Sequence, residues 1–409
     1  MDKYLINPKK NKKSVKIKDF SPYTSLSVNF STSNGLEHCL GYTQTNFGIT
    51  EKVIKGYYLE NSFFLYCADN CLYQNEGGMF VKKIESKNFT PILCSIKSNG
   101  KNVVMALCDG VGYLLGDTVT QIDTPKANSI CEYKGRIFIA NDNLVYYGDA
   151  FDYDNFANVI GGYGYFSFDN RDGAVVKIIT YDDYVLVFCQ KALYKIYTSA
   201  TGEFLTKRLN TFSIKIALDT IAIVGNEVFF ISHGKLVAYK NEALRVIDSL
   251  ENYKIANASG AVDSFNYYTL SITNSDGQKK LFFYDTHANT SFLIENDELV
   301  MIGNGYAFNN ESFKIVELSE KGQVGLKSIW KSKKIDFLVG KHKNLTSIVL
   351  FVEGKGSLRV KGDFGQREFS LDKEYVNIYP NLYSKYFILE IESDEMDFGV
   401  KNLQLEYNL

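Results

Sequence analysis

Histidine, proline and tryptophan are scarce in this chain of 409 residues, which contains four His, five Pro and one Trp. The histidines (His38, His233, His287 and His342) are isolated, without the neighbouring ligands or carboxylates that a metal ion or a general base requires. A G-x-S-x-G motif and a phosphate loop are also missing. We therefore predict no catalytic residues, no cofactor-binding residues and no bound metal ion, and we expect a protein that is not an enzyme.

Long hydrophobic runs are missing as well. No stretch of about 18 apolar residues occurs, and the basic N-terminus is not followed by the apolar core of a signal peptide. The seven cysteines end at Cys189 and mostly lie in apolar runs, which indicates reduced, buried thiols. The closest pair, Cys67 and Cys71, has no matching second pair to complete a zinc site. These features predict synthesis in the cytoplasm and no membrane span.

The abundant residues are 29 Tyr, 29 Phe and 31 Gly. Aromatic residues suit a half-buried pleated surface, and many glycines suit many turns, so the composition favours short β-strands. The net charge of -2 provides no basic field for nucleic-acid binding. Residues 1–18 are an exception, with lysines at positions 3, 9, 10, 12, 13, 16 and 18. This segment is interpreted as a solvated arm or, alternatively, as an arm that docks on an acidic partner or a phosphate backbone.

A unit of strand, polar turn and second strand recurs from about residue 53 to 320. Its copies span 57–84, 95–122, 129–156, 177–209, 220–247 and 261–294, with a partial seventh at 298–318. The marker residues Tyr73, Tyr113, Tyr146, Tyr194, Tyr239 and Tyr284 are spaced by 40, 33, 48, 45 and 45 residues. A drifting period of this length without helical periodicity predicts an all-β fold, a β-propeller of about six or seven irregular blades.

The C-terminal part alternates apolar and polar residues more cleanly, as in "SIVLFVEG" and "FILEIES". This pattern is typical of antiparallel strands in a small β-sandwich. The predicted division is 1–50 for an N-terminal arm and first strands, 51–320 for the propeller and 321–409 for the sandwich.

Three aspartates, Asp149, Asp152 and Asp154, lie together in "NDNLVYYGDAFDYDNF" at 141–156. A calcium loop would place its oxygen ligands at alternate positions, but Asp149 is out of step and no Gly follows. Two carboxylates on one loop rarely straddle a sugar ring as glycoside hydrolysis requires. The favoured interpretation is a blade-edge turn in which Asp side chains cap backbone amides and the aromatics tuck under the next blade. A metal ion at Asp149–Asp154 is left open.

The segment 136–156 resembles an element of bacteriophage tail nozzle and tail-hub proteins, the propeller-containing family that includes tail tubular protein B and packaged-DNA stabilisation proteins. The matching positions are Arg136, Ala140, Asn143, Tyr146, Gly148, Asp149, Asp152, Asn155 and Phe156. Segments 175–198, 222–243 and 329–337 are also similar to that family, which often has Pro where this chain has Tyr153.

The resemblance implies a structural virion protein of the phage tail (nozzle, hub or head–tail adaptor) that is assembled in the host cytoplasm. It also implies a sixfold ring of identical subunits around a DNA channel, which contacts a portal or adaptor ring and other tail proteins. DNA would pass through with only nonspecific contacts. The alternative is a carbohydrate-binding or carbohydrate-active β-propeller, although the Asp-box motif of sialidase blades is not present.

Overall fold

The computed structural model describes residues 12–20, 22, 24–32, 35–98, 101–116, 118–150, 153, 156, 163–211, 216, 220–250, 254–255, 267–273, 277–287, 289–295, 298–319, 322, 324–337 and 340–409. The chain forms two compact units that interleave in sequence. Unit 1 contains residues 1–43, 280–296 and 317–409, and unit 2 contains residues 44–279 and 297–316. This division differs from the predicted one, in which three consecutive segments meet at residues 50 and 320.

The described residues are all β apart from a 3-10 turn at Asn170–Asp172, and none of their helices could span a membrane. Local turn chemistry explains how the hairpins form. In the hairpin of β23 (Glu227–Ser232) and β24 (Lys235–Lys240), His233 and Gly234 have φ angles of 48° and 68°. Two successive left-handed residues match the twist of the flanking strands, so this two-residue turn closes a hairpin.

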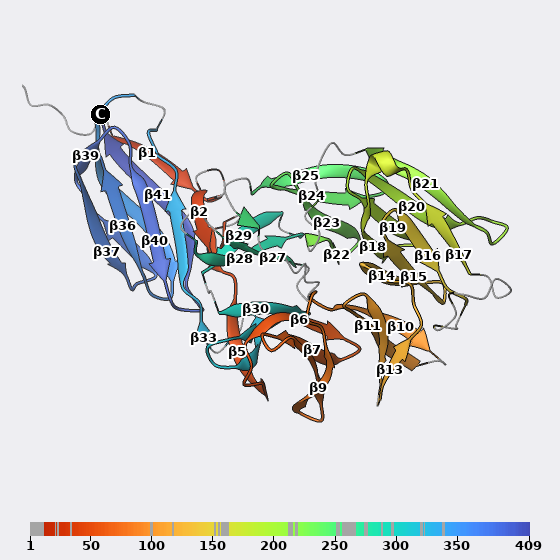
Figure 1. The fold of residues 1–409 in the computed structure, drawn as a ribbon. Coiled ribbons are helices and arrows are strands. Elements are labelled where there is room, and N and C mark those ends of the chain that lie inside the picture. Colours follow the sequence, from red (N-terminus) through yellow and green to blue (C-terminus); the bar gives the residue numbers. More distant parts are fainter. Residues whose placement is uncertain are drawn as a thin grey trace, which may run out of the picture. The chain divides into compact units, whose positions relative to one another are not determined.

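Unit 2 is built on four-stranded antiparallel sheets, which appear as separate strand groups in Figure 1. Five are continuous in sequence: β6–β9 (Val53–Leu59, Ser62–Cys67, Cys71–Glu76, Met79–Glu85), β10–β13 (Ile92–Ser98, Lys101–Cys108, Val111–Leu115, Val119–Ile122), β14–β17 (Ser129–Tyr133, Arg136–Asn141, Leu144–Tyr147, Gly164–Ser167), β18–β21 (Val175–Tyr181, Tyr184–Cys189, Ala192–Thr198, Phe204–Thr211) and β22–β25 (Ala222–Val224, β23, β24, Ala243–Ser249). With the sheet described next, they form a six-bladed β-propeller arrangement, which confirms the prediction of an all-β propeller.

The last sheet, which has five strands, takes its fourth strand from the N-terminal region. Strands β30 (Leu299–Gly303), β31 (Tyr306–Asn309) and β32 (Lys314–Ser319) are completed by β5 (Gly41–Gly48). Thr45 Oγ1 donates to the Ile315 carbonyl at 2.8 Å, and a Cβ on Gly48 would lie 2.5 Å from the Phe313 carbonyl oxygen. The partial seventh copy at 298–318 therefore obtains its fourth strand from more than 250 residues away along the sequence.

Neighbouring sheets are held together by successive apolar clusters. Ile302 and Phe308 pack with Phe63 and Leu65, which joins the last sheet to the first. Similar clusters join β6–β9 to β10–β13, β10–β13 to β14–β17, β14–β17 to β18–β21, and β18–β21 to β22–β25. Strands covered on both faces need apolar residues at nearly every position, which explains the burial of Val185–Cys189 in β19.

The sixth sequence copy, 261–294, contains β27 (Tyr267–Thr273), β28 (Lys279–Asp285) and β29 (Thr290–Ile294), and the short strand β26 (Lys254–Ile255) precedes it. The strand order β26-β27-β28-β29 is the same as in the other copies, but it continues beyond β29 into a longer sheet. Strand β27 falls in unit 2, whereas β28 and β29 fall almost entirely in unit 1. In unit 2, Tyr268 stacks on Phe229 with ring centroids 5.4 Å apart and donates to the Thr220 carbonyl. These contacts attach β27 to the β22–β25 sheet.

Unit 1 buries the faces of two sheets in one core. The first sheet has the order β3-β4-β41-β35-β38, with β1 on β41 and β39 on β35; the second includes β29-β2-β34-β40-β36-β37. The strands are β1 (Lys12–Ile17), β2 (Thr24–Val28), β3 (Phe30–Ser31), β4 (Leu36–His38), β34 (Ser328–Ser332), β35 (Lys343–Glu353), β36 (Gly356–Gly362), β37 (Gly365–Leu371), β38 (Tyr375–Ile378), β39 (Leu382–Ser384), β40 (Ile388–Ser393) and β41 (Gly399–Asn408). A further strand, β33 (Val324–Gly325), pairs with Gly41 and Tyr42.

The lysine-rich N-terminal segment is not a free arm over its described length. Residues Lys12–Ile17 pair antiparallel with β41, and Ile17 is fully buried in the unit 1 core. Lys13, Lys16 and Lys18 remain exposed, while the lysines at positions 3, 9 and 10 lie outside the described residues. The segment became a strand because its Val and Ile side chains reach a core that the C-terminal strands provide.

Candidate functional site

The aspartate segment at 141–156 begins as the predicted blade-edge turn. Strand β16 ends at Tyr147, and the next residue, Gly148, accepts a 2.9 Å hydrogen bond from Arg136 Nη1. Asp149 Oδ1 accepts from the Ala150 backbone N–H at 2.8 Å and lies 3.7 Å from the Arg136 guanidinium. Asp149 therefore caps a backbone amide and pairs with an arginine. Asp152, Asp154 and Asn155 lie outside the described residues. The structure therefore does not test for a metal ion in this loop.

The two described aromatics of this segment are core residues. Tyr153 and Phe156 are each 5% exposed and belong to the cluster between β10–β13 and β14–β17, together with Met105 and Ile122. They therefore pack against the preceding sheet, whereas the sequence predicted the next one.

The histidines are dispersed in the structure. His233 forms a hairpin turn, and the His287 backbone N–H donates to the side chain of Asp285 at 2.8 Å. His38 ends β4. His342 lies between aromatic rings in unit 1, 5.2 Å from Tyr383 and 6.0 Å from Phe364 by ring centroids.

All seven cysteines are free thiols, and all except the half-buried Cys94 are buried. Burial, assisted by the nearby carboxylate of Asp69, raises the pKa of Cys67 to about 12. Burial also raises the pKa of Cys108 to about 12. A metal ligand or nucleophile must be a thiolate, and these environments stabilise the protonated thiol instead.

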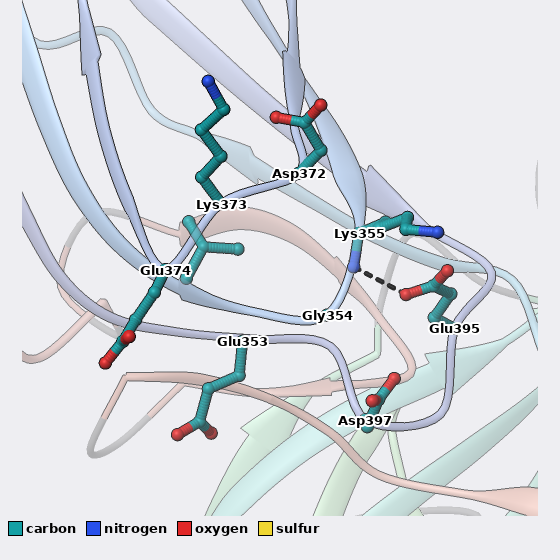
Figure 2. A pocket seen from close by; sticks show the side chains of 9 residues that line it. Glu353, Gly354, Lys355, Asp372, Lys373, Glu374, Glu395 and Asp397 are labelled. Carbon is teal, nitrogen blue, oxygen red and sulfur yellow. Dashed lines mark hydrogen bonds between the residues drawn. The ribbon is translucent and has the colours of Figure 1, made fainter.

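One recess in unit 1 gathers charged side chains that the sequence interpretation did not single out. It has a volume of about 560 Å³ and lies where three connections meet: β35–β36, β37–β38 and β40–β41 (Figure 2). Its charged lining residues are Glu353, Lys355, Asp372, Lys373, Glu374, Glu395 and Asp397. Acidic turns such as "SDEMDF" were the sequence signal that could have pointed to it.

The charged groups of the recess do not converge on one point. The Lys355 backbone N–H donates to Glu395 Oε2 at 2.6 Å, and Glu353 pairs with Lys401. Figure 2 shows the remaining carboxylates splayed in different directions. Within the described ranges, no three His, Cys, Asp or Glu side chains are placed to hold one metal ion. The recess can offer scattered surface charges to a partner.

Comparisons with known proteins bear on the fold. No protein-family model and no curated protein matches the chain. Among solved structures it is similar to the extracellular domain of BT4673 from B. thetaiotaomicron (14% identity, TM-score 0.48, 81% of this chain and 47% of that one). It is also similar to BamB from Moraxella catarrhalis (11%, 0.42, 76% and 97%) and to the WD40 β-propeller domain of Doa1 (14%, 0.34, 76% and 95%). This chain thus spans about half the length of the first structure, and similarity at these TM-scores carries no functional information.

Proposed function

We propose that this protein is a structural component of a bacteriophage tail, a nozzle, hub or head–tail adaptor subunit that forms a ring around the DNA channel. The observation that carries the proposal is the pair of contacts that Arg136 makes within the segment that resembles phage tail proteins. Its guanidinium bridges the end of β16, through the Gly148 carbonyl and the Asp149 carboxylate. The resemblance therefore falls on a contact that builds a blade.

Other residues of the same segment have structural contacts of the same kind. Ala140 is fully buried in the cluster between β14–β17 and β18–β21. The Asn143 side chain donates to the Phe168 carbonyl at 3.1 Å, which ties the β15–β16 turn to the residue after β17. A shared pattern that maintains the fold supports a shared architectural role better than it supports a shared active site.

The path of the chain also suits an architectural role. The polypeptide passes between the units after residues 43, 279, 296 and 316. The units are thus tied by four covalent connections, so a load on one unit is shared by several chain segments. This is a useful property for a part of a tail that is exposed to force when DNA is ejected.

The charge balance is compatible with DNA passage. With a net charge of -2, the protein lacks a general basic field, so contacts with passing DNA would be weak and nonspecific. In this proposal the partners are further copies of the same chain in a sixfold ring, a portal or adaptor ring, and other tail proteins. The protein resides in the virion tail after assembly in the host cytoplasm.

Two observations test the proposal. The gene should lie beside genes for a portal, a terminase or tail fibres. Negative-stain microscopy of the full chain, alone and mixed with the portal or adaptor protein encoded nearby, should reveal rings with a central opening. A portal protein from an unrelated phage serves as the control. The tail assignment would be refuted if the chain stayed monomeric both alone and with the portal or adaptor protein, and if its gene had no such neighbours.

A further inference from the structure

The first sheet of unit 1 has one face on the core and one face turned away from it. Along β35, Leu345, Ile348 and Leu350 enter the core. Side chains alternate along a strand, so Asn344, Val349 and Phe351 point to the opposite side. We use "outer face" for the surface formed by Asn344, Val349, Phe351, Tyr375, Asn377, Tyr379, Tyr383, Asn402, Gln404 and Asn408.

Strand register arranges the outer face in rows of aromatic and amide side chains. Tyr375, Phe351 and Asn402 form one row across β38, β35 and β41. Asn377, Val349 and Gln404 form the next row. Tyr383, Asn344 and Asn408 form the row at the opposite end of β35. Each row thus combines an aromatic or apolar side chain with at least one amide.

The aromatic side chains of this face are unusually open to water. Tyr375, Tyr379 and Tyr383 are 51%, 61% and 59% exposed, and Phe351 is 44% exposed. An exposed aromatic patch on one face commonly marks an interaction site. At one end the patch continues through near-parallel rings, because His342 stacks on Tyr383 at 14° and on Phe364 at 16°. Phe364 is 78% exposed, so this end presents a flat aromatic surface.

Two amide oxygens beside Tyr383 are without hydrogen-bond partners. Asn344 Oδ1 and Asn408 Oδ1 are shielded from solvent, and neither has a partner among the described residues. Leaving a buried acceptor unpaired is unfavourable by roughly 1–3 kcal/mol, so native structures nearly always satisfy such atoms. The two residues are direct cross-strand neighbours, so both unpaired acceptors lie at the same end of the outer face.

The edge of the outer face formed by β38 and β39 has a composition that restricts the class of ligand. Residues 375–384, "YVNIYPNLYS", contain no charged side chain over ten positions. The β38–β39 edge itself therefore provides no cation for a phosphate or a carboxylate. The exposed Lys16 lies at the opposite side of the face, on β1 beside Gln404. The edge offers ring faces for C–H groups and amides that both donate and accept hydrogen bonds. Glu406 also lies on this side of β41, where it accepts from Gln404 Nε2 at 3.3 Å.

We propose that the outer face binds a neutral carbohydrate chain. A pyranose ring has an apolar C–H face that packs on Tyr383 or Tyr375, and its hydroxyl groups exchange hydrogen bonds with amide side chains of the face, such as Asn402 in the row of Tyr375 and Phe351. The inference does not rest on the phage-tail proposal, and it places carbohydrate binding on unit 1 and not on the propeller. A second copy of this chain is the competing occupant of the same face.

The test uses the full chain and an array of neutral oligosaccharides built from glucose, galactose, mannose and N-acetylglucosamine. The strongest binder is then titrated by calorimetry against wild type, Tyr383→Ala and Tyr375→Ala. We expect each substitution to weaken binding about tenfold. Tyr165→Ala is the matched control, because Tyr165 is 60% exposed but lies on β17 of unit 2, and it should bind like wild type.

Three results would overturn the inference. The first is a folded wild-type chain that binds nothing on the array. The second is binding that survives the double substitution Tyr375→Ala and Tyr383→Ala. The third is a concentration-dependent self-association, measured by light scattering, that Tyr383→Ala abolishes, because the outer face would then be an interface between copies. None of these results depends on gene neighbours or on rings formed with a portal protein, so the two proposals fail separately.

Discussion

Trp330 packs edge to face against Phe20, with ring centroids 5.1 Å apart and both side chains fully buried. The indole N–H of Trp330 donates to Thr24 Oγ1 at 2.9 Å. The only tryptophan of the chain thus anchors the N-terminal segment on the strand that begins the C-terminal part of unit 1. Phe20 belongs to this core, and Thr24 is tied to it, because their partner Trp330 is supplied from about 300 residues downstream.

The first prediction concerns this anchor. Thr24→Ala removes the acceptor of a buried indole N–H and should lower the free energy of unfolding by about 1–3 kcal/mol. Trp330 fluorescence during urea denaturation reports the transition directly, because the substitution leaves the fluorophore in place. Thr206→Ala, at an exposed position of β21, serves as the control and should leave the curve unchanged. Equal curves for wild type and Thr24→Ala would refute the anchor.

A second prediction tests the closure by β5. Gly48→Ala would place a methyl group 2.5 Å from the Phe313 carbonyl oxygen, so β5 must move away from β32. We expect a loss of about 1–3 kcal/mol and faster hydrogen exchange in Lys314–Ser319. Gly365→Ala is the control, because a Cβ at that position meets no atom within 4 Å. Unchanged exchange in β32 would show that β5 does not secure this sheet.

The third prediction separates architecture from chemistry at the aspartate turn. Arg136→Met removes the hydrogen bond to Gly148 and the contact with Asp149, and should lower the free energy of unfolding by about 1–2 kcal/mol. Asp149→Ala should have a smaller effect, below about 1 kcal/mol, because its ion pair is long and partly solvated. Chemical denaturation followed by circular dichroism measures both. The reverse order of effects would indicate a further partner for Asp149.

Any hydrolytic activity found for the protein should be insensitive to Asp149→Ala, Asp152→Ala and Asp154→Ala. The reason at Asp149 is that its carboxylate already holds a backbone amide and faces Arg136. Activity is measured on neutral polysaccharides with the wild type alongside. A loss of activity in one variant without a loss of stability would contradict the structural interpretation of this turn.

A fourth prediction concerns pH. Burial opposes ionisation of Asp109, but hydrogen bonds from backbone N–H groups outweigh it and hold the pKa of this carboxyl below its usual value. The donors are Lys87, Asn88 and Phe89, at 2.9, 2.9 and 3.1 Å. They lie in the connection between β9 and β10, so the carboxylate joins two consecutive sheets.

The sign of the effect follows from the lowered pKa. The stabilisation by Asp109 is fully present above the unfolded-state pKa of about 3.9 and is lost as the pH falls through the lower folded-state value. Asp109→Asn should therefore be less stable than wild type at about pH 7, and the difference should shrink below about pH 4. Urea denaturation across this range measures it. A difference that stays constant with pH would mean that the negative charge of Asp109 does not stabilise the fold.

Sequence patterns were informative where structure is local. The hairpin turn at His233 and Gly234 and the burial of β19 on both faces are of this kind, because turn conformation and strand burial depend on residues within a few positions. The marker tyrosines followed the repeated sheets for the same reason. The pattern extends to 261–294, where Tyr284 lies in β28, the third strand of the run β26-β27-β28-β29. The segment does not reveal that this run continues from β29 to β2, since nothing within it records which strand its edge will join.

The amino-acid sequence by itself determined that the protein is all-β, built from repeated hairpins, with reduced thiols and a strand-rich C-terminal part. These properties depend on the alternation of apolar and polar residues, on turn residues and on composition, all of which can be read from short segments of the sequence. Tertiary structure alone decided that β5 joins a sheet whose other strands lie 250 residues away, that Ile17, Phe20 and Phe30 join the C-terminal core, and that Tyr383, Asn344 and Asn408 share one row. Pairing between distant strands depends on which edges and apolar faces remain uncovered after the local hairpins form, and no short segment contains that information.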